Sequence, residues 1–481
     1  MTGIKLVVYA GEYTERKVSL TNLVQLGKMM IWGIIEMTSA PTSQISALPT
    51  KTFFVEMFTK DIALEQAVLD LVDNSVDGAK RYAKAGDTPY AGFQVNLTFN
   101  NEEFLIADNC GGFSSDVAVN YAFRFGRPKG ATSTPGSIGQ FGVGMKRALF
   151  KFGRHFIVQS ATPDEEWAVE VPVTDWENND NDWHFPWGKF APVGGLSKAS
   201  PGTEIQVTKL RPSVSAVFAT KNFENSIVSL IRSKHRSFIG QGMSICVNGT
   251  AVLPIDLVMI SGEGFRPASK TLTFDEGGAP VTVRILAGVG ASQPSLAGWY
   301  VICNGRIILE ADRRAVTGWG VVEDAASKTS IPGFHNQFAR FRGIVTFDST
   351  DSARVPWNTT KTDVDQDNVV WRAAREEMII LMRPVIDFLN ELDADIEENT
   401  RERSPLYKYV EARPLVRFES IEANSLFEAP EREELAPVEK WVKVQYSRKE
   451  DEIDTLKTAL KVNSARAVGE RTFDLTLKRF I

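Results

Sequence analysis

The sequence predicts an α+β fold that is divided into two or three domains. Its 481 residues exceed the ordinary size of a single domain. Segments whose apolar residues recur at helical spacing are interspersed with short segments of alternating apolar and polar residues, which is the pattern of strands. Hydrophobic residues make up 43% of the chain and charged residues 24%, which is the balance of a globular protein with a sizeable core.

Net charge, cysteine content and the lack of a long apolar run bear on the partners and compartment of the protein. The chain has 54 basic and 60 acidic residues and a net charge of −6, so its overall charge does not indicate a general polyanion binder. The three cysteines, Cys110, Cys246 and Cys303, are widely spaced, form no metal-binding pattern and favour a reducing compartment. The apolar run at residues 29–35 is too short to cross a bilayer. We therefore expect a cytoplasmic protein that has no membrane partner.

A helix is predicted over residues 61–80, DIALEQAVLDLVDNSVDGAK, because its apolar residues fall near helical spacing. Asp70, Asn74 and Asp77 are spaced i, i+4 and i+7 and form a second stripe of oxygen ligands. A carboxylate and an amide one turn apart suit a water-activating base beside a magnesium ligand, because Mg²⁺ prefers oxygen donors. Taken alone, such a stripe is more typical of the solvated face of an amphipathic helix.

Two strands are predicted at residues 93–99 and 103–107 by their alternating pattern, and Asn100-Asn101 is predicted to be the hairpin turn between them. The second strand leads into the segment Asp108-Asn-Cys-Gly-Gly112-Phe113. An aspartate at a strand end, followed by two glycines, can direct its carboxylate into a cavity while the backbone lies close to a ligand. Acidic turns are common, so this motif alone does not define a site.

A glycine-rich segment precedes the next predicted helix. Its four closely spaced glycines are Gly136, Gly139, Gly142 and Gly144. Such a turn presents backbone N–H groups and the positive end of the helix dipole to an anion, normally phosphate, and Lys146 can add a positive charge. The residue order of a Walker loop is missing, and no suitable strand directly precedes the segment as in a Rossmann turn. A flexible surface loop is the alternative that this segment alone leaves open.

Other elements follow from the same patterns. Further strands are predicted at residues 155–160, 167–171, 202–208, 243–249, 281–286, 298–308 and 440–446, and the segment 298–308 is predicted to be a hairpin across Asn304-Gly305. Further helices are predicted at residues 222–239, 369–392, 450–461 and 464–473. Residues 175–187, which are rich in Asn, Asp and Trp, are predicted to form an exposed loop.

Four motifs occur in an order that resembles the GHKL ATPase superfamily, which includes DNA gyrase B subunits, MutL proteins, ninety-kilodalton heat-shock chaperones, sensor histidine kinases and MORC proteins. The helix with Asp70 and Asn74 resembles the family's general-base helix. The Asp108 motif is similar to the segment whose aspartate receives the adenine amino group. Residues 137–146 are similar to the phosphate lid loop of the chaperone and MORC branches, and Thr203 matches a threonine that shares the adenine hydrogen-bond network.

The resemblance covers residues 51–210 and implies a two-layer α/β sandwich, the Bergerat fold, that binds ATP with Mg²⁺ and hydrolyses ATP. It implies Asp70 as the general base and Asn74 as the metal ligand. The other nucleotide-binding residues that it implies are Asp77, Asp108, Gly112, Phe113, Gly139, Gly142, Val143, Gly144, Lys146 and Thr203.

One departure from the family bears on the rate of hydrolysis. Hydrolytic members carry glutamate where this chain has Asp70, and the aspartate side chain is one methylene shorter. Its carboxylate would therefore sit further from the attacking water, and misplacement on that scale can lower a rate on the order of 100-fold. We expect slow hydrolysis.

The second half of the chain is similar to the domain that follows the ATPase in gyrase, MutL and MORC proteins. Residues 211–393 resemble this transducer domain, whose lysine reaches the γ-phosphate of ATP. Lys361, in the segment PWNTTKTD, occupies the corresponding place in the order of elements, which implies the same catalytic role. Residues 394–481 are predicted to form a small, mainly helical docking module, and residues 1–50 an N-terminal extension.

These predictions favour an ATP-gated conformational switch or homodimeric clamp that acts on a nucleic acid or a protein. A non-hydrolysing nucleotide sensor in a multi-protein assembly, such as a phage-defence system, is an alternative that Asp70 favours. A histidine kinase is less favoured, because none of the four histidines lies on a dimerisation helix that precedes the ATPase motifs.

Overall fold

The computed structural model has the predicted mixed α+β fold. It describes residues 49–126, 134–139, 142–321, 330–432 and 442–481, so almost all of the predicted extension, residues 1–50, lies outside the described residues. The chain divides into two compact units. The first contains Met1–Thr132, Ile138–Ile231 and Gln241–Leu253. The second contains Ser133–Ser137, Arg232–Gly240 and Pro254–Ile481.

The first unit is built on a seven-stranded sheet of order β4-β3-β5-β2-β1-β6-β7. Its strands are β1 (Gln94–Phe99), β2 (Phe104–Asp108), β3 (Gly153–Ala161), β4 (Glu166–Pro172), β5 (Gly202–Leu210), β6 (Ser244–Val247) and β7 (Thr250–Ala251). β1 and β6 are parallel, and the other neighbouring pairs are antiparallel. The unit extends beyond residue 210, where the sequence predicts a domain boundary, because β6 pairs with β1. The predicted domain boundaries themselves stay predictions.

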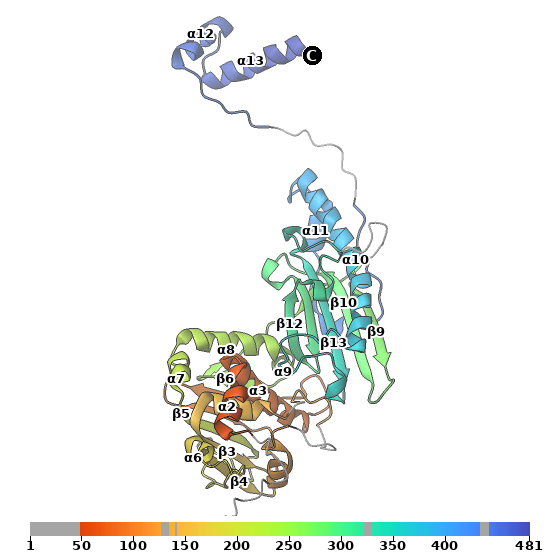
Figure 1. The fold of residues 1–481 in the computed structure, drawn as a ribbon. Coiled ribbons are helices and arrows are strands. Elements are labelled where there is room, and N and C mark those ends of the chain that lie inside the picture. The colour runs from red at the N-terminus through yellow and green to blue at the C-terminus, as the bar shows by residue number, and fades with distance from the viewer. Residues whose placement is uncertain (1–48, 127–133, 140–141, 322–329, 433–441) are drawn as a thin grey trace, which may run out of the picture. The chain divides into compact units, whose positions relative to one another are not determined.

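Helices complete the first unit (Figure 1). They are α2 (Lys51–Lys60), α3 (Leu64–Lys80), α4 (Ser115–Val117), the π-helical turn η1 (Ala118–Ala122), α5 (Gly144–Phe152), α6 (Val173–Glu177), α7 (Pro212–Phe218) and most of α8 (Lys221–Lys234). α3 packs against α5 and has the predicted apolar stripe, which is buried. Glu65 in its first turn and Lys80 in its last turn complement the helix dipole.

The second unit has a five-stranded sheet of order β12-β11-β13-β10-β9. Its strands are β9 (Ala268–Phe274), β10 (Val281–Val289), β11 (Gly298–Cys303), β12 (Arg306–Asp312) and β13 (Phe341–Ser349). The long helix α10 (Val369–Asn399) contacts β9, β10 and β13 (Figure 1). The remaining elements of this unit include α9 (Arg236–Gly240), β8 (Val258–Ile260), α11 (Pro405–Glu411) and β14 (Leu415–Arg417), and β8 pairs with β14.

The hairpin of β11 and β12 turns at an Asn-Gly pair. Asn304 and Gly305 have φ angles of 47° and 85°, so both lie in the left-handed region. Asn and Gly are the residues that such a two-residue turn requires. The hairpin predicted over residues 298–308 therefore has its turn where the sequence indicates.

The predicted exposed loop at residues 175–187 is wrong at its start. α6 includes Trp176, whose side chain is only 7% exposed. The Nζ atom of Lys51 lies 4.0 Å from the centre of the Trp176 ring and donates a hydrogen bond of 2.7 Å to the Trp176 carbonyl. The start of this segment therefore packs against α2 through Trp176. The sequence pattern did not indicate this packing, because most residues around Trp176 are polar.

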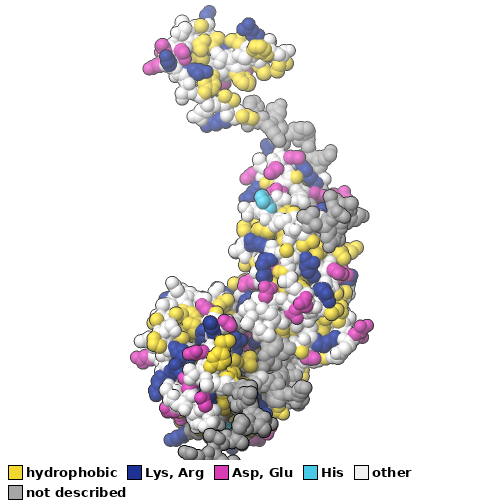
Figure 2. Space-filling view, viewed as in Figure 1, with side chains coloured by type: hydrophobic (Ala, Val, Ile, Leu, Met, Phe, Trp, Pro, Cys, Tyr) yellow, Lys and Arg dark blue, Asp and Glu magenta, His cyan; other side chains and the backbone are white. Residues whose placement is uncertain are grey.

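The C-terminal segment contains both predicted helices, α12 (Glu450–Leu460) and α13 (Ala465–Phe480). The strand predicted at residues 440–446 is wrong for its described part, since residues 442–446 are exposed and have no strand. A strand needs a hydrogen-bonded neighbour, and alternation in sequence does not supply one. Figure 2 shows hydrophobic side chains on the surface of this segment. Of the helices in the described part of the chain, none has the length and apolar character needed to cross a bilayer.

Candidate functional site

The predicted stripe of oxygen ligands on α3 lies against the glycine-rich segment. Asp70 and Asp77 are 8% and 9% exposed, whereas Asn74 is exposed. A Cβ atom added at Gly139 would lie 3.2 Å from Oδ2 of Asp77, and one added at Gly144 would lie 3.1 Å from Oδ2 of Asp70. The two carboxylates are therefore covered by backbone, which excludes a simple solvated helix face.

Asp77 fixes the start of the glycine-rich segment. Its Oδ1 accepts a hydrogen bond of 2.7 Å from the backbone N–H of Ile138, and its Oδ2 accepts one of 2.7 Å from that of Gly139. Burial raises the pKa of Asp77, and the nearby Lys80 and the two backbone bonds oppose that rise. These bonds give the Asp77 carboxylate a structural role, which is to hold the glycine-rich segment. The nucleotide contact predicted for Asp77 stays a prediction.

Asp70 and Asn74 lie one helical turn apart, as predicted. Oδ1 of Asp70 accepts a hydrogen bond of 3.1 Å from Nε2 of Gln66. The amide oxygen of Asn74 lies near the glycine segment, because a Cβ atom at Gly139 would be 3.5 Å from it. An exposed amide oxygen between two carboxylates fits Mg²⁺, which takes one or two protein oxygens and keeps several waters. No group of three or more His, Cys, Asp or Glu side chains that could hold a metal occurs in the described part of the chain.

Strand pairing brings Asp108 and Thr203 together, although they are far apart in sequence. They are opposite residues in the antiparallel pair of β2 and β5. Oδ1 of Asp108 accepts hydrogen bonds from the backbone N–H of Thr203 at 3.2 Å and of Cys110 at 2.9 Å. Oδ2 accepts one of 2.6 Å from the Ser75 hydroxyl. Desolvation raises the pKa of Asp108, and the Ser75 bond opposes that rise.

Ser75 is a site residue that the sequence reasoning missed. It follows Asn74 on α3. Because it is small and falls at helical spacing with the apolar residues, it groups with the apolar stripe. Its side chain is 6% exposed and donates to Asp108. The sequence did contain a signal for this role. A serine on the apolar stripe of the helix is expected to be buried, and a buried hydroxyl requires a hydrogen-bond partner.

Gly112 lies where three strand ends converge. Its φ is +61°, and a Cβ atom there would lie 2.1 Å from the Ala161 carbonyl oxygen. The next backbone N–H, that of Phe113, donates a hydrogen bond of 2.9 Å to the Ser160 hydroxyl. The Phe113 ring packs edge-to-face on Trp167 with a centroid distance of 4.8 Å. Only glycine fits position 112, because both the conformation and the close approach exclude a side chain.

The other end of the glycine-rich segment is fixed by Lys146. Gly142 has a φ of 64°, Val143 precedes the first residue of α5, and Lys146 lies in its first turn. Nζ of Lys146 donates hydrogen bonds of 2.6 Å to the carbonyls of Ala122 and Gly142. Burial lowers the pKa of Lys146 to about 7. Its predicted contact with phosphate stays a prediction.

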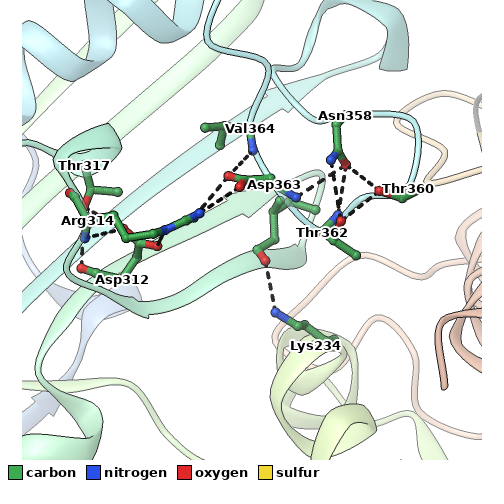
Figure 3. A network of polar contacts seen from close by, with 10 residues as sticks. Lys234, Asp312, Arg314, Thr317, Asn358, Thr360, Thr362, Asp363 and Val364 are labelled. Carbon is green, nitrogen blue, oxygen red and sulfur yellow. Dashed lines mark hydrogen bonds and ion pairs between the residues drawn. The ribbon is translucent and has the colours of Figure 1, made fainter. Parts of the chain in front are cut away.

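Lys361 lies in the second unit, on a loop between β13 and α10. Its side chain is 6% exposed and its φ is 55°. Figure 3 shows the contacts that hold this loop, in which the guanidinium of Arg314 donates to both oxygens of Asp363 at 2.8 and 3.1 Å. The side-chain oxygen of Asn358 accepts from the N–H of Thr362 at 3.0 Å. The Lys361 carbonyl accepts a bond of 3.2 Å from Arg306, so the loop is fixed on both sides of its lysine.

Comparison with known proteins gives the class to which this site belongs. The family model for "Histidine kinase-, DNA gyrase B-, and HSP90-like ATPase" matches residues 62–203. Residues 62–203 therefore form an ATP-binding domain of the GHKL ATPase superfamily, which confirms the resemblance seen in the sequence. The closeness to the MORC and chaperone branches stays a prediction. A search of curated proteins found no match for the chain.

Proposed function

We propose that this protein is an ATP-operated conformational switch, in which binding of ATP with Mg²⁺ by residues 62–203 changes how the molecule contacts a second copy and a client. The observation that best supports this proposal is the position of the glycine-rich segment against α3 in the first unit. The segment is held by Asp77 and by Lys146 and lies against the carboxylates of Asp70 and Asp77. A segment of this kind is suited to bind phosphate through its N–H groups.

Asp108 is proposed to bind the adenine amino group. An ionised carboxylate has about four acceptor positions. Three of them are used by Ser75, Cys110 and Thr203. The remaining position is held in a fixed direction, so it suits one further N–H donor. This supports the assignment of Asp108 and Thr203 to adenine recognition, with Gly112 and Phe113 forming the adjoining turn.

Asp70 is proposed as the general base, and Asn74 as the ligand of Mg²⁺. ATP with Mg²⁺ would supply the phosphoryl group and its charge neutralisation, while Asp70 would accept a proton from the attacking water. Since the side chain is shorter than the family's glutamate, turnover is slow. A non-hydrolysing nucleotide sensor is the second candidate function, and the shorter side chain of Asp70 is what favours it.

Lys361 is proposed to couple nucleotide state to conformation. A ligand shifts a conformational equilibrium only if it binds one state better than another. A lysine that contacts the γ-phosphate provides this difference, because ADP lacks that group. The fixed loop of Lys361, with its left-handed backbone and the Arg314–Asp363 pair, is suited to hold one lysine in one direction.

Two measurements test this function. Calorimetric titration with a non-hydrolysable ATP analogue and Mg²⁺ is expected to show saturable binding, and absence of binding would contradict the proposal. Steady-state phosphate release, measured with the protein alone and with DNA, separates the two candidates. Slow release that is above background supports the ATPase, whereas binding without release under both conditions supports the sensor.

A further inference from the structure

Lys146 has an unusual environment for a charged side chain. It is 1% exposed, and its Nζ atom donates to two backbone carbonyls, those of Ala122 and Gly142. The centre of the Phe125 ring lies 5.9 Å from Nζ. Among the residues that the structure describes, no carboxylate forms an ion pair with it. A buried ammonium without a counter-charge is costly.

The number of hydrogen bonds matches the neutral amine. A neutral lysine amine has two N–H donors and a lone pair, whereas the ammonium has three N–H donors. The carbonyls of Ala122 and Gly142 satisfy the two donors of the neutral form. Position also matters, because Lys146 lies in the first turn of α5, where the helix dipole disfavours a positive charge. The lowering of the pKa of Lys146 to about 7 agrees with both arguments.

The charged groups on and around α5 are consistent with a neutral amine at Lys146. α5 packs against α2, α3, β3 and β5. On α3, Asp70 lies beside Gly144, Asp73 is buried, and Asp77 binds Ile138 and Gly139. On α5 itself, Arg147 donates to the Phe58 carbonyl and Lys151 donates to the Thr59 carbonyl. On α2, Lys51 donates to the Trp176 carbonyl; on the two strands, His155 contacts the Thr208 hydroxyl and Glu204 accepts from the N–H groups of Val193 and Gly194. The pKa of Lys146 is lowered by burial, and no charged neighbour within the described part of the chain opposes that lowering.

We propose that Lys146 is neutral in the nucleotide-free protein and takes up a proton when the polyphosphate of ATP binds. The lone pair of Nζ forms the new N–H bond, and a buffer acid supplies the proton and becomes its conjugate base. The third N–H then has an acceptor, a phosphate oxygen, and the charge has a counter-charge. This inference rests on the proposed function, since it requires that the glycine-rich segment binds the phosphates.

A pH dependence of binding follows. Where the amine is neutral before binding and charged after it, each bound ATP removes one proton from solution. The affinity then falls by up to about tenfold for each unit of pH above about 7. Titrations of the unmodified protein from about pH 6 to about pH 9 are expected to show this fall. An affinity that is constant above about pH 7 would overturn the proposal without the need for a variant.

Calorimetry in two buffers of different ionisation enthalpy measures the proton directly. At about pH 8, a non-hydrolysable ATP analogue with Mg²⁺ is expected to bind with uptake of nearly one proton. Lys146→Arg, which is charged at every working pH, should bind without that uptake, and Lys146→Met should bind weakly and without it. Lys151→Met, on the same helix, is the matched control and should retain the uptake.

The outcomes separate the inference from the function on which it rests. If the unmodified protein does not bind the analogue in either buffer, the proposed function fails. If it binds with an enthalpy that does not depend on the buffer, or if Lys146→Arg keeps the full uptake, the function stands and the assignment of the proton to Lys146 is wrong.

Discussion

Single residues in the first unit have roles that follow from their hydrogen bonds. Asp108 is held by three donors from α3, β5 and its own turn, so its carboxylate points in one direction. Oδ1 of Asp70 accepts a hydrogen bond from Gln66, and the Asp70 carboxylate lies against Gly144. The first arrangement suits the proposed recognition of adenine, and the second places the proposed general base beside the glycine-rich segment. Two predictions follow at this scale.

Asp108→Asn is expected to weaken ATP binding. The amide would turn an N–H group toward some of the donors that now bind the carboxylate, and it would weaken the bond to the adenine amino group. A hydrogen bond to a charged group contributes about 1.5–3 kcal/mol, so the affinity should fall by at least about tenfold. Calorimetric titration measures it, with the exposed Asp164→Asn as control. Equal affinities in Asp108→Asn and the unmodified protein would rule out this role.

Asp70→Asn is expected to bind ATP and to lose hydrolysis, because the amide cannot accept the proton. Asp70→Glu is expected to hydrolyse faster than the unmodified protein, since the added methylene restores the reach of the glutamate that hydrolytic members of the family carry. Phosphate release at saturating ATP measures both. If Asp70→Asn turns over at the unmodified rate, another residue is the base.

At the scale of elements, the sequence predicts what depends on local pattern. The period of α3, the β1–β2 hairpin and the Asn304-Gly305 turn were all predictable, because each is determined by neighbouring residues. The missing strand at residues 442–446 and the burial of Trp176 were not, because both depend on a distant partner. The pairing of Asp108 with Thr203 likewise needed the family resemblance as well as the two motifs.

Gly112→Ala tests the convergence of the three strand ends. The alanine would have a positive φ and would place its Cβ atom 2.1 Å from the Ala161 carbonyl oxygen. Backbone strain alone costs about 1–3 kcal/mol, and the clash adds to it. Gly195→Ala is the matched control, because Gly195 has a φ of +77° and nothing within 4 Å of an added Cβ atom. Denaturant unfolding should show a larger loss of stability for Gly112→Ala, and equal losses would contradict the close approach.

At the scale of the whole molecule, the structure has two units with different contributions to the proposed switch. The first unit has the proposed nucleotide-binding residues on α3, the β2–β5 pair and the glycine-rich segment. The second has Lys361 on a loop that Arg306 and Arg314 hold. The client, nucleic acid or protein, is expected to respond to the nucleotide state only through a change that includes both units.

Lys361→Met is expected to bind ATP nearly normally and to lose the conformational response. Its carbonyl and backbone contacts would be retained, since they do not use the amine. Binding is measured by calorimetry and the response by light scattering, with the exposed Lys408→Met as control. A full response in Lys361→Met would show that another group senses the γ-phosphate.

The central claim is that ATP, and not ADP, changes the state of the molecule. Light scattering of the unmodified protein, saturated in turn with a non-hydrolysable ATP analogue and with ADP, measures its mass and radius. We predict that the analogue compacts the molecule or raises its dimer fraction, while ADP leaves both quantities as in the nucleotide-free protein. An unchanged mass and radius with the saturating analogue would contradict the switch and leave a passive nucleotide sensor.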